Sequence, residues 1–264
     1  DGLLVGLTAT PREDIEHDTY SLLNTDSEDV FAYELEDAVE EHHLVGYNVL
    51  QRQSIIMTQG VKYDDLSQQE KQQLETAWAY EKAKLALDPR SEYARDIDAN
   101  EILQVFYNQD TIDKVLEDLM ENGLRVNDGD TIGKTIIFAY RHKHAEMIVE
   151  RFNALYPQYG PDFCTLIDNQ VKYGQDLIDN FSAAPQDQKK KIQIAVSVDM
   201  LDTGVDVPDV LNLVFFKQVR SKVKFMQMIG RGTRLCPNIF GAGKDKEQFY
   251  IFDHCGNFEY FGSQ

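Results

Sequence analysis

The sequence predicts an α/β fold in which helices flank a mostly parallel β-sheet. Over residues 131–264, short apolar runs alternate with amphipathic stretches, the rhythm of the β-α-β units that build parallel sheets. The apolar runs have the length of buried strands, and the stretches between them have helical length and periodicity. We expect strands at 135–139, 192–196, 211–216 and 249–252, with helices at 142–156, 173–181 and 221–229.

The first half of the chain differs in composition and in the pattern of its apolar residues. Residues 1–12 contain an apolar strand at 3–8, which we expect near the edge of the sheet or projecting from it. Residues 13–130 are acidic and rich in Gln, Glu and Tyr, and we interpret them as a largely helical insertion or a flank against the sheet. The elements expected there are helices near 31–42, 67–87 and 109–122 and a polar strand near 48–59.

Composition bounds the class of protein. With 264 residues and 42% hydrophobic content, the chain can bury the core of one large domain. No apolar run approaches the roughly 18 residues of a membrane helix, and the first residues carry no basic leader, so we expect a soluble protein. Neither the cysteines (Cys164, Cys236 and Cys255) nor the six histidines have metal-ligand spacing, which indicates free thiols in a reducing cytoplasm and no bound metal.

The formal net charge of −19 limits how this chain could contact nucleic acid. Nucleic-acid-binding proteins usually present a basic face, because counterion release from phosphates supplies much of their affinity. Any such contact here needs a local basic strip on an acidic body. Residues 217–234 contain no Asp or Glu and supply one. Its cations are Lys217, Arg220, Lys222, Lys224, Arg231 and Arg234.

One apparent phosphate-binding loop is excluded by its spacing. In the segment 129–135, three residues separate the two glycines, whereas the motif needs four. Lys134 and Thr135 also lead into a predicted strand, although the motif places this pair at the start of a helix, where amide groups face the phosphates. We therefore expect no nucleotide binding through this segment.

The strongest motif is the segment 227–234, Gln-Met-Ile-Gly-Arg-Gly-Thr-Arg. A solvated helix end would explain two arginines, but it would not require Gln227, both glycines or the apolar lead-in. An arginine held on a rigid element commonly stabilises charge on a transferring phosphoryl group. The segment resembles motif VI of superfamily 2 helicases, Gln-x-x-Gly-Arg-x-x-Arg. The resemblance implies that Arg231 and Arg234 reach the γ-phosphate of ATP. Gln227 and Gly230 would support this contact.

A second segment, 197–208, resembles motif V of the same helicases. Thr203 offers a hydroxyl and an amide to a DNA phosphate. Gly204 permits a backbone turn close to a nucleotide. Asp206 can accept a hydrogen bond from a ribose hydroxyl or orient an arginine. By itself this turn would be weak evidence, but it precedes motif VI by about the spacing of the family.

Two further segments extend the resemblance towards the N-terminus. Thr8-Ala9-Thr10 is similar to motif III, which relays the nucleotide state between two motor domains, so we interpret Thr8 and Thr10 as coupling residues. Residues 135–141 and the helix start after them resemble motif IV, on the DNA-tracking side. In the family, motifs I and II precede motif III, so the resemblance implies that they would lie before Asp1.

The resemblance narrows to the R subunit, the motor and nuclease subunit of type I restriction enzymes. It implies a RecA-like second motor domain that supplies motifs V and VI to ATP hydrolysis coupled to the movement of duplex DNA. A first motor domain would bind most of the ATP and Mg²⁺, Thr203 and the basic residues 217–224 would hold DNA phosphates, and this segment alone would be inactive. The implied partners are duplex DNA and the methyltransferase and specificity subunits of a cytoplasmic complex, with no membrane contact. The segments that carry the resemblance are 33–39, 106–113, 134–139, 198–208, 214–236 and 249–258.

Two alternatives stay open. Another superfamily 2 motor, such as that of a type III restriction enzyme or a DNA-repair helicase, would carry the same motifs. A nuclease domain upstream in the full gene, and methyltransferase and specificity subunits as co-purifying partners, would separate these cases. The R subunit's nuclease core belongs to another domain and has no convincing copy in this sequence. A non-catalytic acidic interaction module with a motor-like fold is favoured by the charge of −19, but the intact arginine motif speaks against it.

Overall fold

The computed structural model of the chain describes residues 35–52, 109–168, 174–183, 192–201 and 206–262, together with four two-residue strands. Those strands pair antiparallel, β1 (Glu13–Asp14) with β2 (His17–Asp18) and β4 (Val61–Lys62) with β5 (Asp96–Ile97). The strand expected at 3–8 and the helix expected at 67–87 lie outside the described residues.

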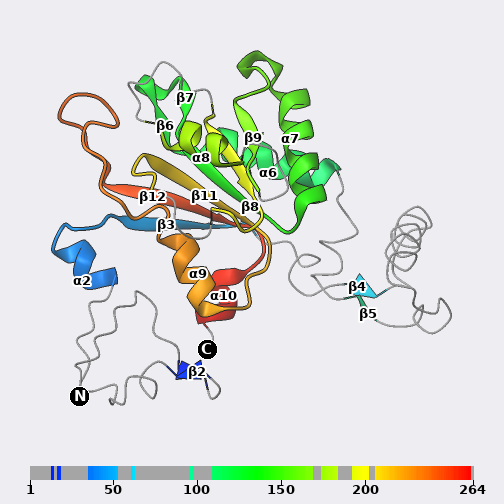
Figure 1. The fold of residues 1–264 in the computed structure, drawn as a ribbon, viewed down its shortest axis with the longest axis horizontal. Helices are drawn as coiled ribbons and strands as arrows, with labels where there is room; N and C mark the ends of the chain where they lie inside the picture. The colour runs from blue at the N-terminus through cyan, green and yellow to red at the C-terminus, as the bar shows by residue number, and fades with distance from the viewer. Residues whose placement is uncertain are drawn as a thin grey trace.

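A six-stranded sheet, with all neighbours parallel, forms the centre of the fold in the order β3-β12-β11-β8-β10-β9 (Figure 1). Every residue of β8, β10 and β11 is buried, as expected of parallel strands that are covered on both faces. The four strands expected from apolar runs are present, and the predicted α/β class is confirmed. The bounds are β3 (Gly46–Gln51), β8 (Lys134–Ala139), β9 (Cys164–Leu166), β10 (Ile194–Ser197), β11 (Val210–Phe216) and β12 (Gln248–Asp253).

Helices cover both faces of this sheet. Helices α6 and α7 pack with Ile137 and Val214 on one face, and α8, α9 and α10 pack with Ile136 and Leu213 on the other. Figure 1 shows α6 and α7 above the sheet and α9 and α10 below it. No helix in the described part of the chain is long and apolar enough to cross a membrane. The helices are α2 (Leu35–Glu40), α6 (Gln109–Asn122), α7 (His142–Leu155), α8 (Gly174–Ser182), α9 (Lys222–Ile229) and α10 (Asn257–Gly262), with a 3₁₀ turn η4 (Pro157–Tyr159) after α7.

The acidic segment contributes to the sheet itself. Helix α6 spans the predicted helix 109–122, and α2 lies inside the one predicted near 31–42. The polar strand expected near 48–59 is displaced to β3 at 46–51, which pairs in parallel with β12. Because β3 is an edge strand with half-buried and exposed side chains, its sequence pattern is polar. Five strands of the sheet thus lie in residues 131–264, and the sixth comes from the acidic segment.

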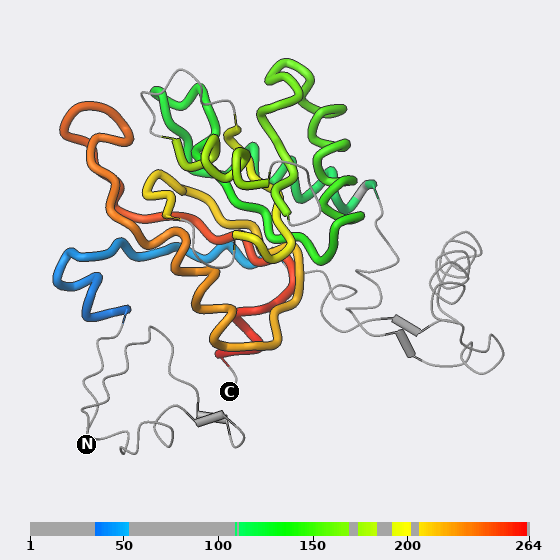
Figure 2. The backbone as a smooth tube through the Cα atoms, in the orientation of Figure 1, coloured from blue at the N-terminus to red at the C-terminus, as the bar shows by residue number. Residues whose placement is uncertain are grey.

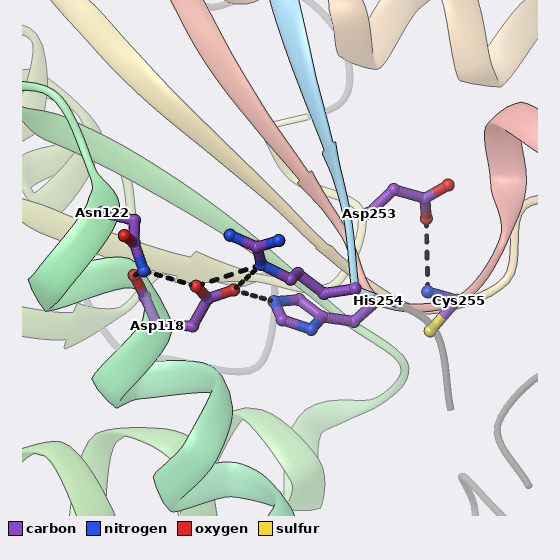
Figure 3. A network of polar contacts seen from close by, with 6 residues as sticks. Asp118, Asn122, Asp253, His254 and Cys255 are labelled. Carbon is purple, nitrogen blue, oxygen red and sulfur yellow. Dashed lines mark hydrogen bonds and ion pairs between the residues drawn. The ribbon is translucent and has the colours of Figure 1, made fainter. Parts of the chain in front are cut away.

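A polar network joins this segment to the end of β12 (Figure 3). On α6, the carboxylate of Asp118 accepts a hydrogen bond from Nε of Arg52 at 3.2 Å, just after β3. It also accepts one from Nδ2 of Asn122 at 2.8 Å. The imidazole of His254, which follows β12, lies with Nε2 3.8 Å from the same carboxylate. These contacts fix α6 and β3 against the carboxyl ends of the strands.

The segment that mimicked a phosphate-binding loop is a hairpin. Strands β6 (Arg125–Val126) and β7 (Thr131–Ile132) flank the 3₁₀ turn η3 (Asn127–Gly129), and Lys134 opens β8. The Lys134 side chain is 1% exposed, and its ammonium lies 2.8 Å from the Asp209 carboxylate and donates to the Phe181 carbonyl. The expectation that Lys134 leads into a strand is confirmed. Its charged group pairs with Asp209 inside the core.

Candidate functional site

Helix α9 presents the motif VI segment. Ser221 caps the helix, because its hydroxyl accepts a hydrogen bond from the backbone N–H of Lys224. One face of the helix is anchored in the core by Phe225, Met228 and Ile229. Gln227 lies between these anchors and is half-buried. The last turn of α9 thereby holds the start of the motif against the sheet.

The turn after α9 is held by short-range contacts. Nε of Arg231 donates to the Gln227 carbonyl at 3.3 Å, and the Thr233 hydroxyl donates to the Gly230 carbonyl at 3.1 Å. A Cβ atom at Gly232 would lie 2.3 Å from the Phe249 ring, so only glycine fits there without displacing that ring. The turn therefore carries Arg231 and Arg234 on a backbone packed directly against β12.

The segment that resembles motif VI contacts the segment that resembles motif V through Arg234. Its Nε lies 3.1 Å from Oδ1 of Asp206, and the two side chains are 58% and 66% exposed. An exposed ion pair of this kind contributes only about 0–1 kcal/mol to stability. Both charged groups face solvent in a pair weak enough to be exchanged for a ligand.

The remaining motif residues are only partly described. Thr203 and Gly204 of motif V, and Thr8 and Thr10 of motif III, lie outside the described residues. Upstream of that gap, the backbone N–H of Leu201 donates to the Ser197 hydroxyl at 3.2 Å. Of the motif V residues selected from the sequence, Asp206 is the one that the structure places.

The basic strip divides into a buried and an exposed part. The ammonium of Lys217 donates to the Val198 carbonyl and lies 3.4 Å from the Asp199 carboxylate, and the residue is 8% exposed. Arg220 is exposed and lies over the Tyr260 ring, with its guanidinium carbon 5.1 Å from the ring centre. Lys222 and Lys224 are exposed on α9. Lys217 thus joins β11 to the segment after β10, whereas the other three cations of the 217–224 strip face solvent.

Sequence reasoning missed Lys246, which lies close to the motif residues. Its ammonium donates to the carbonyls of Gly232 at 2.7 Å and Pro208 at 3.1 Å, and the residue is 3% exposed. Lys246 occurs in the charged run Lys-Asp-Lys-Glu, which is typical of a solvated loop. The sequence offered no signal that this lysine is buried.

The sequence also did not indicate the contact between His142 and Asp168, which lie just after the carboxyl ends of β8 and β9. Nδ1 of His142 lies 2.5 Å from Oδ2 of Asp168, and Nε2 lies 3.4 Å from the Glu146 carboxylate. The hydrogen bond to Asp168 raises the pKa of His142, which favours the protonated imidazole. From the sequence, only the contact between His142 and Glu146 could have been predicted, because these residues lie four apart on one helix.

All three cysteines of the sequence lie in the described residues. The three cysteines are free, and burial raises the pKa of the Cys164 and Cys255 thiols. Within the described ranges, no three His, Cys, Asp or Glu side chains are grouped to hold a metal ion.

The chain is similar in sequence to proteins of known family. Residues 110–236 match the family described as helicase conserved C-terminal domain. The type I restriction enzyme EcoKI endonuclease subunit of Escherichia coli strain K12 is 38% identical over 128 residues, which are 46% of this chain and 10% of that protein. The Escherichia coli EcoAI endonuclease subunit is 26% identical over 241 residues, covering 88% of this chain and 26% of the relative.

A solved structure shares the fold. It is a fragment, described as an HsdR subunit, of a type I restriction enzyme from Vibrio vulnificus YJ016, with a TM-score of 0.61 and 22% identity. The match covers 96% of this chain and 40% of that one. The RecA-like fold expected from the helicase resemblance is confirmed. The chain spans about a tenth and a quarter of the two curated relatives named above.

Proposed function

We propose that this chain is the second motor domain of an ATP-dependent DNA translocase. The proposal is supported by the match of residues 110–236 to the helicase conserved C-terminal domain family and by the similarity to type I restriction enzyme endonuclease subunits. The translocase would move duplex DNA within a type I restriction endonuclease. In such a motor, two RecA-like domains hold ATP between them, and this chain supplies the motif V and motif VI side chains.

The contact between Arg234 and Asp206 carries the proposal. Two residues from separate motifs meet at 3.1 Å on the surface, beside a turn that also carries Arg231. A guanidinium presents several donors in a planar fork that matches phosphate oxygens, and it stabilises the charge of a transferring phosphoryl group. Arg231 and Arg234 are assigned to the γ-phosphate, with Asp206 and Gln227 orienting them and Gly204 and Gly230 shaping the backbone near the nucleotide.

The nucleotide itself is assigned mainly to a first motor domain. Mg²⁺ is assigned with the nucleotide, mainly to that first domain. When bound by the first domain, Mg²⁺ would neutralise phosphate charge. Thr8 and Thr10 are assigned to coupling between the two domains. On this assignment, the chain alone does not hydrolyse ATP.

DNA contacts are assigned to the exposed cations and to motif V. Arg220, Lys222 and Lys224 face solvent close to one another in the sequence, and Thr203 offers a hydroxyl to a phosphate. Lys217 is assigned a supporting role, because its ammonium is already engaged by Val198 and Asp199. Each phosphate contact that is lost should reduce the slope of log affinity against log salt by about 1.

The proposed partners follow from the relatives, which are named as subunits of type I restriction enzymes. They are duplex DNA and the methyltransferase and specificity subunits of the same cytoplasmic complex. Co-purification with those subunits would separate this assignment from a type III restriction motor or a DNA-repair helicase.

The test is DNA-stimulated ATP hydrolysis by the full-length translocase that contains this chain, comparing wild type with Arg234→Ala at equal folded concentration. We expect turnover to fall on the order of 10³-fold, with ATP binding largely retained. Lys244→Ala removes an exposed cation outside the motifs and should leave turnover unchanged. Unchanged turnover in Arg234→Ala would remove this arginine from the catalytic role and favour either Arg231 alone in that role or a non-catalytic module.

A further inference from the structure

Lys246 connects two loops that approach each other near the proposed catalytic arginines. It lies at the end of the excursion between α9 and β12, which Figure 2 shows in orange leaving the body and returning to the sheet. The ammonium donates to the Gly232 carbonyl at 2.7 Å and to the Pro208 carbonyl at 3.1 Å. It also lies 5.6 Å from the centre of the Phe249 ring, the ring that packs on Gly232. One cation thus links two separate backbone segments.

The two carbonyls occupy matching positions relative to the ion pair. Pro208 follows Asp206 by two residues, and Gly232 precedes Arg234 by two residues. The exposed Arg234–Asp206 pair is too weak to set the distance between these loops, since such pairs contribute about 0–1 kcal/mol. Hydrogen bonds from a charged donor are roughly twice as strong as those between neutral groups. The ammonium of Lys246 therefore ties the two loops together more firmly than the exposed pair does.

The surroundings of Lys246 make its charge costly to bury. The residue is 3% exposed, and burial lowers the pKa of its ammonium to about 8, although the nearby Cys236 and Asp209 act in the opposite direction. Asp209 is itself paired with Lys134 at 2.8 Å. An apolar side chain of similar volume would avoid this desolvation. The hydrogen bonds to the two loops are the specific contribution that an apolar side chain cannot supply.

We propose that Lys246 is a positioning residue of the proposed ATPase site. Its ammonium holds the loop of Asp206 against the loop of Arg231 and Arg234, and so fixes the direction in which Arg234 reaches a phosphate. This inference rests on the proposed function, because it requires that Arg234 act in hydrolysis.

The first test removes the charge and keeps the aliphatic stem. In the full-length translocase, Lys246→Met should lower kcat for DNA-stimulated hydrolysis by up to about 100-fold, as expected when a catalytic group is misplaced by about an ångström. KM for ATP should change little, because the lost interaction acts in the transition state. Lys244→Met removes an exposed lysine from the same loop and should leave both parameters unchanged.

A double variant separates positioning from general destabilisation. In the Arg234→Ala background, Lys246→Met should cause no further fall in turnover, because its effect passes through Arg234. Losses that multiply in the double variant would overturn the positioning role. If Arg234→Ala alone leaves turnover unchanged, the role proposed for Arg234 in hydrolysis fails. If Arg234→Ala lowers turnover and a folded Lys246→Met does not, only the inference about Lys246 fails.

The pH profile gives a readout that does not depend on the stability of the methionine variant. Wild-type turnover should decline as pH rises above about 8, as Lys246 loses its proton. Lys246→Arg should retain turnover over this range, because guanidinium stays protonated below pH of about 12. Cys236 faces the same ammonium, so the decline should persist in Cys236→Ala. An identical decline in Lys246→Arg would contradict the proposal.

Discussion

Nε of Arg234 lies 3.1 Å from the carboxylate of Asp206, and both side chains remain more than half exposed. The pair joins two segments that the sequence separates by a complete strand and helix, β11 and α9. Its exposure means that its contribution to folding is small, since water and salt screen the attraction. We therefore expect the contact to affect the orientation of the Arg234 guanidinium more than the stability of the fold.

This relationship predicts a separation of stability from activity. Asp206→Asn should change the free energy of unfolding by less than about 1 kcal/mol, because an exposed ion pair contributes no more. In the full-length translocase, the same variant should lower DNA-stimulated turnover, because Arg234 loses its orienting partner. Urea unfolding and ATP hydrolysis measure the two effects, with Glu247→Gln as an exposed acidic control. A large loss of stability together with normal turnover would reverse the assignment.

A substitution at Gly232, in contrast, should lower the stability of the fold. Any side chain there meets the Phe249 ring, with an alanine Cβ 2.3 Å from the nearest ring carbon. Gly232→Ala should destabilise the fold by about 1–3 kcal/mol through overpacking, measured by urea unfolding. Gly230→Ala is the matched control, because its φ of −55° suits alanine and its Cβ would lie 3.4 Å from the nearest atoms. Equal stability losses at both positions would argue against the Phe249 contact.

The sequence predicted the strands of the sheet better than its edges. Buried parallel strands such as β8 and β11 are continuous apolar runs, so their position follows from composition. The edge strand β9 has three residues, too few for a recognisable pattern, and the α10 turn was missed. Strand β3 is a polar edge strand, and its pairing with β12 joins residues about 200 positions apart, which periodicity cannot indicate.

The same limit applies to the candidate site. The motif around Gln227 and Arg234 is local, and its spacing could be recognised directly. The burial of Lys217 and Lys246 depends on which loop folds over each ammonium, which is decided by tertiary contacts. A lysine in a charged run and a lysine in a buried bridge have the same local sequence signature. The burial of Lys217 and Lys246 therefore could not be predicted from the sequence.

Lys134 tests the exclusion of the apparent phosphate-binding loop. Its ammonium lies 2.8 Å from the Asp209 carboxylate, with 1% and 8% of the two side chains exposed. Lys134→Met should destabilise the fold by about 3–5 kcal/mol, because it leaves a buried carboxylate without this cation. Lys134→Met combined with Asp209→Asn should recover part of the loss, measured by urea unfolding. If Lys134→Met instead leaves stability unchanged and abolishes ATP binding, the segment is a nucleotide site after all.

His254 predicts the behaviour of the fold in acid. Burial lowers the pKa of its imidazole to about 4, from an ordinary value of 6.5, and its Nε2 has no hydrogen-bond partner beside Asp118 (Figure 3). Because the unfolded chain takes up this proton first, the stabilisation present above pH 6.5 is lost as pH falls from about 6.5 to about 4. Between pH 7 and pH 5, this histidine alone should remove about 2 kcal/mol from the free energy of unfolding.

Replacing His254 by a side chain that does not titrate isolates this effect from other acid-sensitive groups. His144 is also buried, with its pKa lowered to about 3, so part of the acid sensitivity remains in any single variant. His254→Gln should therefore flatten, without abolishing, the fall in unfolding free energy between pH 7 and pH 5, measured by urea unfolding at each pH. His43→Gln, at an exposed position, should leave the slope as in wild type. A wild-type slope in His254→Gln would mean that folding leaves the pKa of this imidazole unchanged, and a fall steeper than in wild type would mean that the imidazole is protonated in the folded chain and that its contact with Asp118 at 3.8 Å is an ion pair.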